Sequence, residues 1–397
     1  MLTFCSILLI LMFYFLKKSI YIVILGFSYF IFSIVTDGLM MGYFKEQMFY
    51  DTVNIDLSLI YIWSIQTVAF IIFSLIIRKD IQKDYSLIND KKLLKLGYLL
   101  FLVSLLTTIY KLYTSPSIIL MFTNPREWEF AFGANSFLNY IYFLHVISGF
   151  IFTYLYVKYK RFKYLIFICI SVFLSVFHGI KFTIIHALFM PVFLYLIMNN
   201  YKIRKSIVFV GIIFLSLMLY YFNNVRGGGL DGLIGYITSS SIQSIYVIQN
   251  SDLIINSPFG VFVPDFYVHI QHIFNRLTDN NYISAGTGTG FILNDMYNLF
   301  APISTASMFT TISYVLVLSY IAVVVNFFKS IKSATISLLF IESILMFSIF
   351  MIFVGWSFFA LKLLYLILIM ILIDRRIILK KLFSKIKVQN EKNIICN

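Results

Sequence analysis

The sequence predicts an all-α polytopic integral membrane protein with about eleven transmembrane helices and one large extracytoplasmic loop. Of its 397 residues, 60% are hydrophobic and 12% are charged, which is more apolar surface than one water-soluble core can hide. Apolar runs recur at about the length that crosses roughly 30 Å of hydrocarbon. Only one long segment, residues 223–302, is too polar and too glycine-rich to lie in lipid.

The apolar runs, taken in order, predict the spans one by one. The first run is short for a span; no basic residue precedes it and Lys17-Lys18 follows it, the reverse of a signal peptide. We therefore expect a first span with its N-terminus outside. The predicted spans are residues 2–16, 19–36, 57–77, 93–113, 137–157, 164–180, 182–198, 206–222, 303–328, 334–354 and 356–373.

The segments between these runs alternate in charge. One set holds 24 Lys and Arg residues: Lys17-Lys18, residues 78–95, 158–163 and 202–205, Lys329 with Lys332, and the tail from Arg375. The opposite set holds Lys45, Arg126, Lys181, Arg226 and Arg276. Because basic residues concentrate on the cytoplasmic side of a membrane, the first set is predicted to be cytoplasmic. This places the C-terminus inside and the loop 223–302 outside.

The net charge of +14 is explained by this topology. Eleven acidic residues fall on the predicted outer side and five on the inner side, so the basic excess belongs to the inner connections. A nucleic-acid partner is therefore not expected. The predicted organisation is transmembrane helices at 1–222, the extracytoplasmic loop with amphipathic helices at 223–302, transmembrane helices at 303–373, and a basic cytoplasmic tail at 374–397.

Ligand-bearing residues are sparse. Cys5 and Cys169 lie in apolar runs and Cys396 lies in the tail, so we expect no disulfide, no structural metal and no cofactor. Glu342 and Lys362 fall within predicted spans, where charges are costly and often functional. If these two spans are antiparallel neighbours, the two residues can pair. The alternatives are a purely structural ion pair and a Lys362 that extends to the outer interface.

Two short outer segments are candidate walls of a site. Residues 114–130 contain two prolines followed by Arg126, Glu127, Trp128 and Glu129, a pattern that predicts a re-entrant or interfacial stretch. Trp128 is interpreted as an interface anchor, while Arg126 is one of few outer cations. The turn H-G-I-K places His178 and Lys181 at the outer membrane surface, where Lys181 can meet the phosphates of a lipid carrier or serve only as an anchor.

The long loop holds the strongest candidates for chemistry. Arg226 follows the eighth span and precedes three glycines, and an arginine binds phosphate oxygens through two parallel hydrogen bonds. We expect Arg226 to contact a pyrophosphate; the alternatives are an interface anchor and a partner for Asp231. Further along, a helix from Pro264 to Leu277 would carry a single polar stripe on the face opposite its apolar residues. That stripe can supply a general base and an anion clamp, or it is an ordinary solvated face. It consists of Asp265, His269, His272 and Arg276.

These features together resemble the Wzy-type O-antigen polymerases, which join oligosaccharide repeat units. The likeness rests on about eleven spans, a late outer loop opened by V-R-G-G-G, a tight outer turn with a basic residue two spans earlier, and a second arginine in the loop. The likeness in architecture covers most of the chain, whereas the likeness in motifs is confined to Lys181, Arg226 and Arg276. Family members often have arginine in the tight turn, so Lys181 is a departure.

The resemblance implies a glycosyltransferase on the outer face of the bacterial inner membrane that uses neither a nucleotide sugar nor a metal. Its substrate would be an oligosaccharide linked to undecaprenyl pyrophosphate, with Arg226, Arg276 and Lys181 on the pyrophosphate. Its protein partners would be a chain-length regulator and a flippase. An O-antigen ligase, a flippase, and a glycosyltransferase with catalytic acids in the first outer loop are the alternatives.

Overall fold

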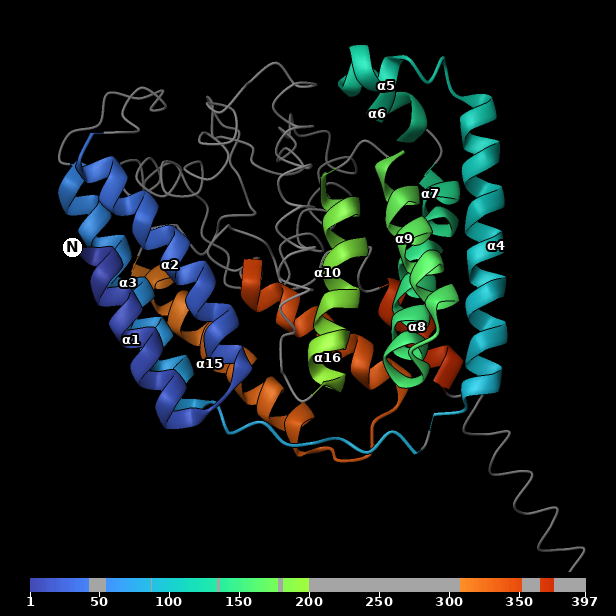
Figure 1. The fold of residues 1–397 in the computed structure, drawn as a ribbon. Coiled ribbons are helices and arrows are strands. Elements are labelled where there is room, and N and C mark those ends of the chain that lie inside the picture. Colours follow the sequence, from blue (N-terminus) through green and yellow to red (C-terminus); the bar gives the residue numbers. More distant parts are fainter. Residues whose placement is uncertain are drawn as a thin grey trace, which may run out of the picture. The chain divides into compact units, whose positions relative to one another are not determined.

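The structure, a computed structural model, describes residues 1–42, 55–86, 88–133, 136–177, 181–199, 308–351 and 365–374 (Figure 1). These residues are almost entirely α-helical and include no named β-strand; one isolated parallel bridge joins Asp84 to Ser333. The predicted all-α class agrees with this part of the chain.

Within the described residues, four stretches of helix are long and apolar enough to cross a membrane. They are α2 (Ile20–Met40), most of α3 (Ile55–Ile76), α4 (Asp90–Thr114), and the pair α7 (Ser136–Tyr142) and α8 (Leu144–Tyr159). Shorter apolar stretches occur in α1 (Leu2–Lys17), α9 (Phe162–Val176), α10 (Lys181–Met198), α15 (Met308–Ser330), α16 (Ile336–Met351) and Tyr365–Asp374. Every predicted run overlaps one of these helices except 206–222, which lies outside the described residues. The number of spans stays a prediction.

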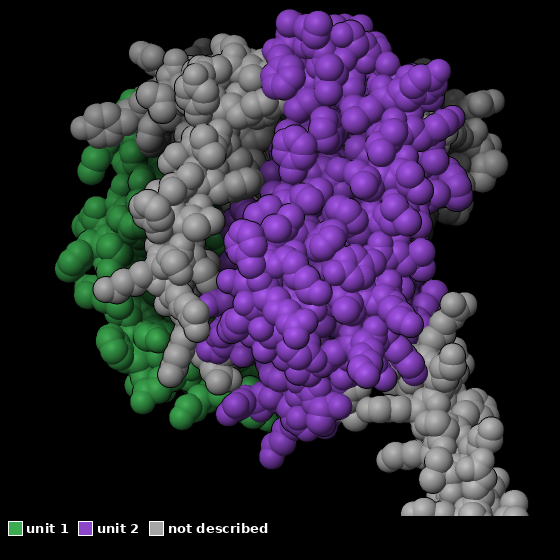
Figure 2. Space-filling model, turned by 45° about the vertical axis from the view of Figure 1, so that its right-hand side comes forward, with its two compact units in different colours: residues 1–81, 203–330, 345–361 green, residues 82–202, 331–344, 362–397 purple. Residues whose placement is uncertain are grey.

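The chain divides into two compact units, coloured separately in Figure 2. Unit 1 consists of residues 1–81, 203–330 and 345–361, and unit 2 of residues 82–202, 331–344 and 362–397. Each unit is therefore discontinuous in sequence, and α16 begins in unit 2 and ends in unit 1.

In unit 1, α2 packs against α1 and α3, and α15 packs against α3. A Cβ atom at Gly26 would lie 2.9 Å from the side chain of Ile10, so glycine allows α1 and α2 to approach closely. Asn326 fastens α15 to the end of α3: its amide donates to the carbonyl of Ile76 (2.8 Å) and accepts from the amide of Arg78 (2.9 Å).

In unit 2, α8 packs against α4, α9 and α10. Gly97 of α4 meets Ile151 of α8, and Gly149 of α8 meets Ser171 of α9, so small residues again lie where helices approach most closely. After α4 the chain forms two short helices that pack together, α5 (Leu120–Thr123) and α6 (Pro125–Gly133). The stretch predicted to be re-entrant or interfacial is thus helical in most of its length.

Basic segments predicted to be cytoplasmic share one end of unit 1. The ammonium of Lys17 donates to the carbonyl of Leu75 (3.0 Å), and that of Lys329 donates to the carbonyl of Arg78 (2.6 Å) and lies 2.5 Å from Asp80. The C-terminal ends of α1, α3 and α15 therefore meet at this end.

Unit 2 shows the same grouping. Lys158 at the end of α8 forms an ion pair with Asp90 at the start of α4 (2.6 Å). The backbone of Asp84 exchanges hydrogen bonds with Lys332 and Ala334 (2.8 Å each), which joins the connection before α4 to the one before α16. Two connections that the charge pattern alone assigns to the cytoplasmic side thus lie together.

Candidate functional site

The loop residues proposed for chemistry lie outside the described residues. They are Arg226, Asp265, His269, His272 and Arg276, together with His178 of the tight turn. Their stripe and their roles stay predictions.

Arg126 and Lys181 are placed by their backbones. Arg126 is the second residue of α6 and Lys181 the first of α10, and the side chains of both lie outside the described part. The indole nitrogen of Trp128 donates to the carbonyl of Phe177 (2.8 Å), the residue that caps α9 just before the turn to Lys181. This bond fixes α6 against the end of α9, so Arg126 and Lys181 belong to the same end of unit 2.

Trp128 is not the interface anchor that the sequence suggested. It is 0% exposed, and its ring stacks on that of Phe132, one helical turn later, at a centroid distance of 5.5 Å. Its polar nitrogen is satisfied by a backbone carbonyl inside the protein, and water is not needed. Phe130, between them in sequence, is 69% exposed, so α6 turns one face into unit 2 and the other outward.

Lys111, in the last turn of α4, is a charged residue that the sorting of outer and inner segments missed. Its side chain is 3% exposed; its ammonium donates to the side-chain oxygen of Asn139 and lies 4.4 Å from the ring centroid of Phe132 and 5.8 Å from that of Tyr142. The available signal was a lysine within the apolar run 93–113. A lysine near a helix end usually extends to water, whereas this one turns inward.

His145 joins α8 to α9. Its Nδ1 lies 2.6 Å from the carbonyl of Tyr142 and its Nε2 lies 2.7 Å from the hydroxyl of Ser175. A carbonyl only accepts, so Nδ1 carries the proton and, in the neutral imidazole, Nε2 accepts from Ser175. This resembles half of a serine–histidine nucleophile, but both residues are 0% exposed, and the third partner is a carbonyl in place of an acid. We interpret the pair as a fastening between helices.

Glu342 has a partner that the sequence analysis did not name. It forms an ion pair with Lys83 (2.6 Å), and the side chains are 0% and 3% exposed. Lys362, the expected partner, lies outside the described residues. Lys83 belongs to the basic connection before α4, which folds back onto α16. Burial, and then the charge of Glu342, raise the pKa of Tyr85 in the same connection above its ordinary value.

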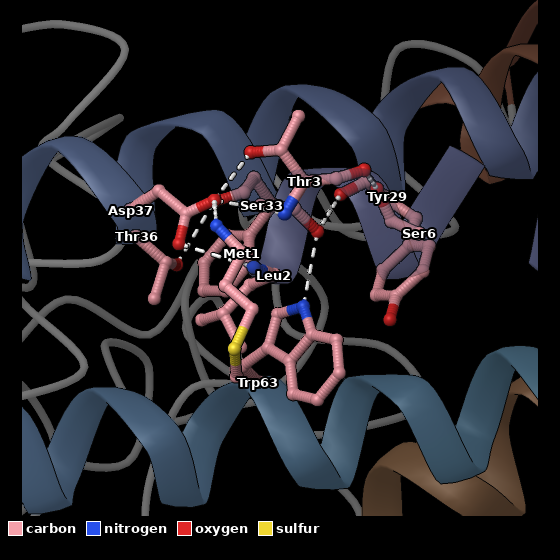
Figure 3. A network of polar contacts seen from close by, with 10 residues as sticks. Met1, Leu2, Thr3, Ser6, Tyr29, Ser33, Thr36, Asp37 and Trp63 are labelled. Carbon is pink, nitrogen blue, oxygen red and sulfur yellow. Dashed lines mark hydrogen bonds and ion pairs between the residues drawn. The ribbon is translucent and has the colours of Figure 1, made fainter. Parts of the chain in front are cut away.

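Asp37 caps the N-terminal end of α1 in unit 1 (Figure 3). Its carboxylate accepts from the backbone amides of Leu2 (3.2 Å) and Thr3 (2.8 Å) and from the hydroxyl of Thr3 (2.7 Å), and it lies 3.1 Å from the amino group of Met1. The first amides of a helix have no partner within the helix. Asp37 of α2 therefore caps α1 from outside, a structural task that argues against a catalytic one.

No model of a known protein family matches this chain, and neither a curated protein nor a solved structure matches it. Among the described residues, no group of three or more His, Cys, Asp and Glu side chains is arranged to hold a metal ion.

Proposed function

We propose that the chain is an O-antigen or capsule-type polysaccharide polymerase of the bacterial inner membrane. It transfers a growing glycan from undecaprenyl pyrophosphate to a sugar hydroxyl of a lipid-linked repeat unit on the outer face. The observation that carries the proposal is the scarcity of cations on the predicted outer side: the loop 223–302 holds five aspartates and two arginines, Arg226 and Arg276. Arginines in a net acidic loop at a lipid surface suit a pyrophosphate ligand.

The reaction needs two kinds of group. The bond between the anomeric carbon of the donor glycan and the pyrophosphate oxygen breaks, and a bond from that carbon to the acceptor oxygen forms. Arg226, Arg276 and Lys181 stabilise the negative charge that develops on the departing lipid pyrophosphate. The acceptor hydroxyl gives its proton to a general base, for which His269, His272 and Asp265 are the candidates.

Unit 2 adds circumstantial support for this arrangement. The hydrogen bond from Trp128 to Phe177 joins α6, which carries Arg126 at its start, to the end of α9, after which α10 begins at Lys181. The basic segments predicted to be cytoplasmic gather at contacts elsewhere, such as that of Lys158 with Asp90. Two of the five predicted outer cations thus belong to one neighbourhood although 55 positions separate them in the sequence.

An O-antigen ligase is the second candidate, since it uses the same donor and differs in passing the glycan to the lipid A core. A flippase for lipid-linked oligosaccharide would transport without chemistry and would be expected to show internal repeats. A glycosyltransferase with its catalytic acids in the first outer loop is less favoured, because Asp37, one of the acidic residues of that region, caps α1.

The test is a complemented deletion strain whose surface polysaccharide is separated on a gel. Arg226→Ala and Arg276→Ala are expected to lower long polymer by roughly 10²-fold or more, as for loss of a donor that stabilises an oxyanion. Core carrying a single repeat is expected to remain. Arg226→Lys tests the need for a two-pronged contact, and Lys45→Ala is the control for an outer cation given no role. Full ladders in both alanine variants would contradict the proposal; loss of the single repeat would favour a ligase or a flippase.

A further inference from the structure

Lys111 is a buried cation at the end of α4, next in sequence to a segment of unit 2 that is predicted to be outside. Its ammonium is held by Asn139 of α7 and by the rings of Phe132 of α6 and Tyr142 of α7, and its side chain comes from the last turn of α4. One side chain therefore touches two elements that follow α4 in the chain. An ammonium withdrawn from water is tolerated only where fixed groups replace its hydration.

Further contacts connect this cluster to α6 and to the end of α9. Asn139 donates to the carbonyl of Gly133, the last residue of α6 (3.0 Å), while Phe132 packs edge-on against Tyr142 (5.6 Å). Phe132 also stacks on Trp128, which is bonded to Phe177 at the end of α9. An unbroken series of contacts thus runs from Lys111 through α6 to the residue that caps α9.

A second connection reaches α9 from the same cluster. The hydroxyl of Tyr142 donates to the carbonyl of Leu174, and its backbone carbonyl accepts from Ser104 of α4 (2.8 Å). The cluster therefore couples α4, α6, α7 and α9 within one unit. Arg126 lies on α6, and Lys181 begins α10, the helix that follows α9. The cluster therefore fastens the helix that carries Arg126 and the helix that precedes Lys181.

We propose that Lys111 is a positioning residue: its ammonium, held between Asn139 and the ring of Phe132, docks α6 onto unit 2 and so sets where Arg126 and Lys181 stand. The role assigned to those two cations rests on the proposed polymerase function; the docking of α6 does not. If Lys111 only ended α4, Trp128 would stay shielded from solvent when the charge of Lys111 is removed. If Lys111 docks α6, removing that charge would expose Trp128.

The first measurement reports docking without any enzyme assay. In the full-length protein carrying Trp63→Phe and Trp356→Phe, Trp128 is the sole tryptophan, and acrylamide quenching reports its accessibility. Lys111→Met is expected to raise the quenching constant severalfold, and Lys111→Arg to restore shielding in large part because the charge is kept. Lys95→Met, an exposed lysine on the same helix, is the matched control. Asn139→Leu removes the partner and leaves the charge, and it gives a second route if Lys111→Met does not fold.

The second measurement uses lipid-linked repeat units extracted from the deletion strain as the probe. Lys111→Met is expected to raise the half-saturating concentration by about tenfold, the effect of losing a hydrogen bond to a charged group, with a smaller change in kcat. Lys111→Arg and Lys95→Met should stay near the wild type. If Trp128 stays shielded from acrylamide in both Lys111→Met and Asn139→Leu, the docking claim is wrong. If Trp128 becomes accessible but the half-saturating concentration does not change, the link between docking and the site is wrong. Wild-type protein that does not extend the extracted lipid overturns the polymerase function itself.

Discussion

At the scale of single residues, buried and half-buried polar side chains fasten helices to segments that lie far from them in the sequence. Lys329 reaches the carbonyl of Arg78, Glu342 pairs with Lys83, and Asp37 caps the start of α1. In lipid a backbone amide or a charge without a partner costs more than in water, since no solvent replaces the partner. Each of these contacts is therefore a point at which one substitution should loosen a helix.

Asp37→Ala should destabilise the docking of α1. The change removes the acceptor for the amides of Leu2 and Thr3, and loss of a helix cap costs about 1–2 kcal/mol. The midpoint of thermal unfolding of the purified protein in detergent is the measurement. Asp37→Asn keeps one acceptor oxygen and should lose less. Equal midpoints for Asp37→Ala and the wild type would show that the cap contributes nothing to stability.

At the scale of elements, unit 2 depends on glycines where α4, α8 and α9 approach one another. A Cβ atom at Gly97 would lie 2.9 Å from the Cγ2 atom of Ile151, closer than atoms of this kind normally come. Isoleucine is stiff because it branches at Cβ, so it yields little. The packing of α4 on α8 therefore leaves no room for a methyl group.

Gly97→Ala should consequently lower the free energy of unfolding by about 1–3 kcal/mol through overpacking. Gly133→Ala is the matched control, because nothing lies within 4 Å of the Cβ position there. Unfolding midpoints in detergent would compare the two. In a double-mutant cycle with Ile151→Ala, the two costs should be less than additive, since the second change removes the clashing atom. A Gly97→Ala variant as stable as Gly133→Ala would mean that α4 and α8 separate easily.

The sequence predicts the helices better than it predicts what fastens them. An apolar run of span length has few alternatives in a chain this hydrophobic, so α2, α4 and α8 overlap their predicted runs. The break at Phe143 between α7 and α8 lies inside one apolar run and has no signal of its own. Trp128 was misread for a similar reason: its spacing to Phe132 fits a buried face, but two of the groups that meet this face, the carbonyl of Phe177 and the ammonium of Lys111, are remote in sequence.

In the candidate site, too, the sequence indicates single residues better than it indicates their contacts. Arg126 and Lys181 were chosen as candidates because cations are rare on the predicted outer side, a property that is visible in the sequence, and their roles stay predictions. Lys111 was missed because its partners, Asn139 and Phe132, are ordinary residues until the fold brings them to its ammonium. Lys83 was likewise counted only as one of the cytoplasmic basic residues, and the return of its segment to α16 shows that it is buried.

At the scale of the whole molecule, the proposed chemistry depends on one property, the side of the membrane on which each end of a helix lies. Sorting 24 basic residues to one side and five to the other predicts that the loop 223–302 faces outward, away from the cytoplasm. Nucleotide sugars are cytoplasmic donors, so an outer loop favours a lipid-linked donor. If the orientation were reversed, Arg226 and Arg276 would face the wrong compartment for such a reaction.

Cysteine labelling tests this orientation directly. In a variant with Cys5, Cys169 and Cys396 changed to serine, single cysteines are introduced by Ser117→Cys between α4 and α5, Ser239→Cys in the long loop, and Ser330→Cys at the end of α15. Ser117 and Ser330 are exposed, so access to reagent depends on the side of the membrane. A membrane-impermeant maleimide added to intact spheroplasts should label positions 117 and 239 and leave position 330 unlabelled until the membrane is opened. Labelling of position 330 alone would invert the topology, and the polymerase proposal would fail with it because its candidate residues would lie in the cytoplasm.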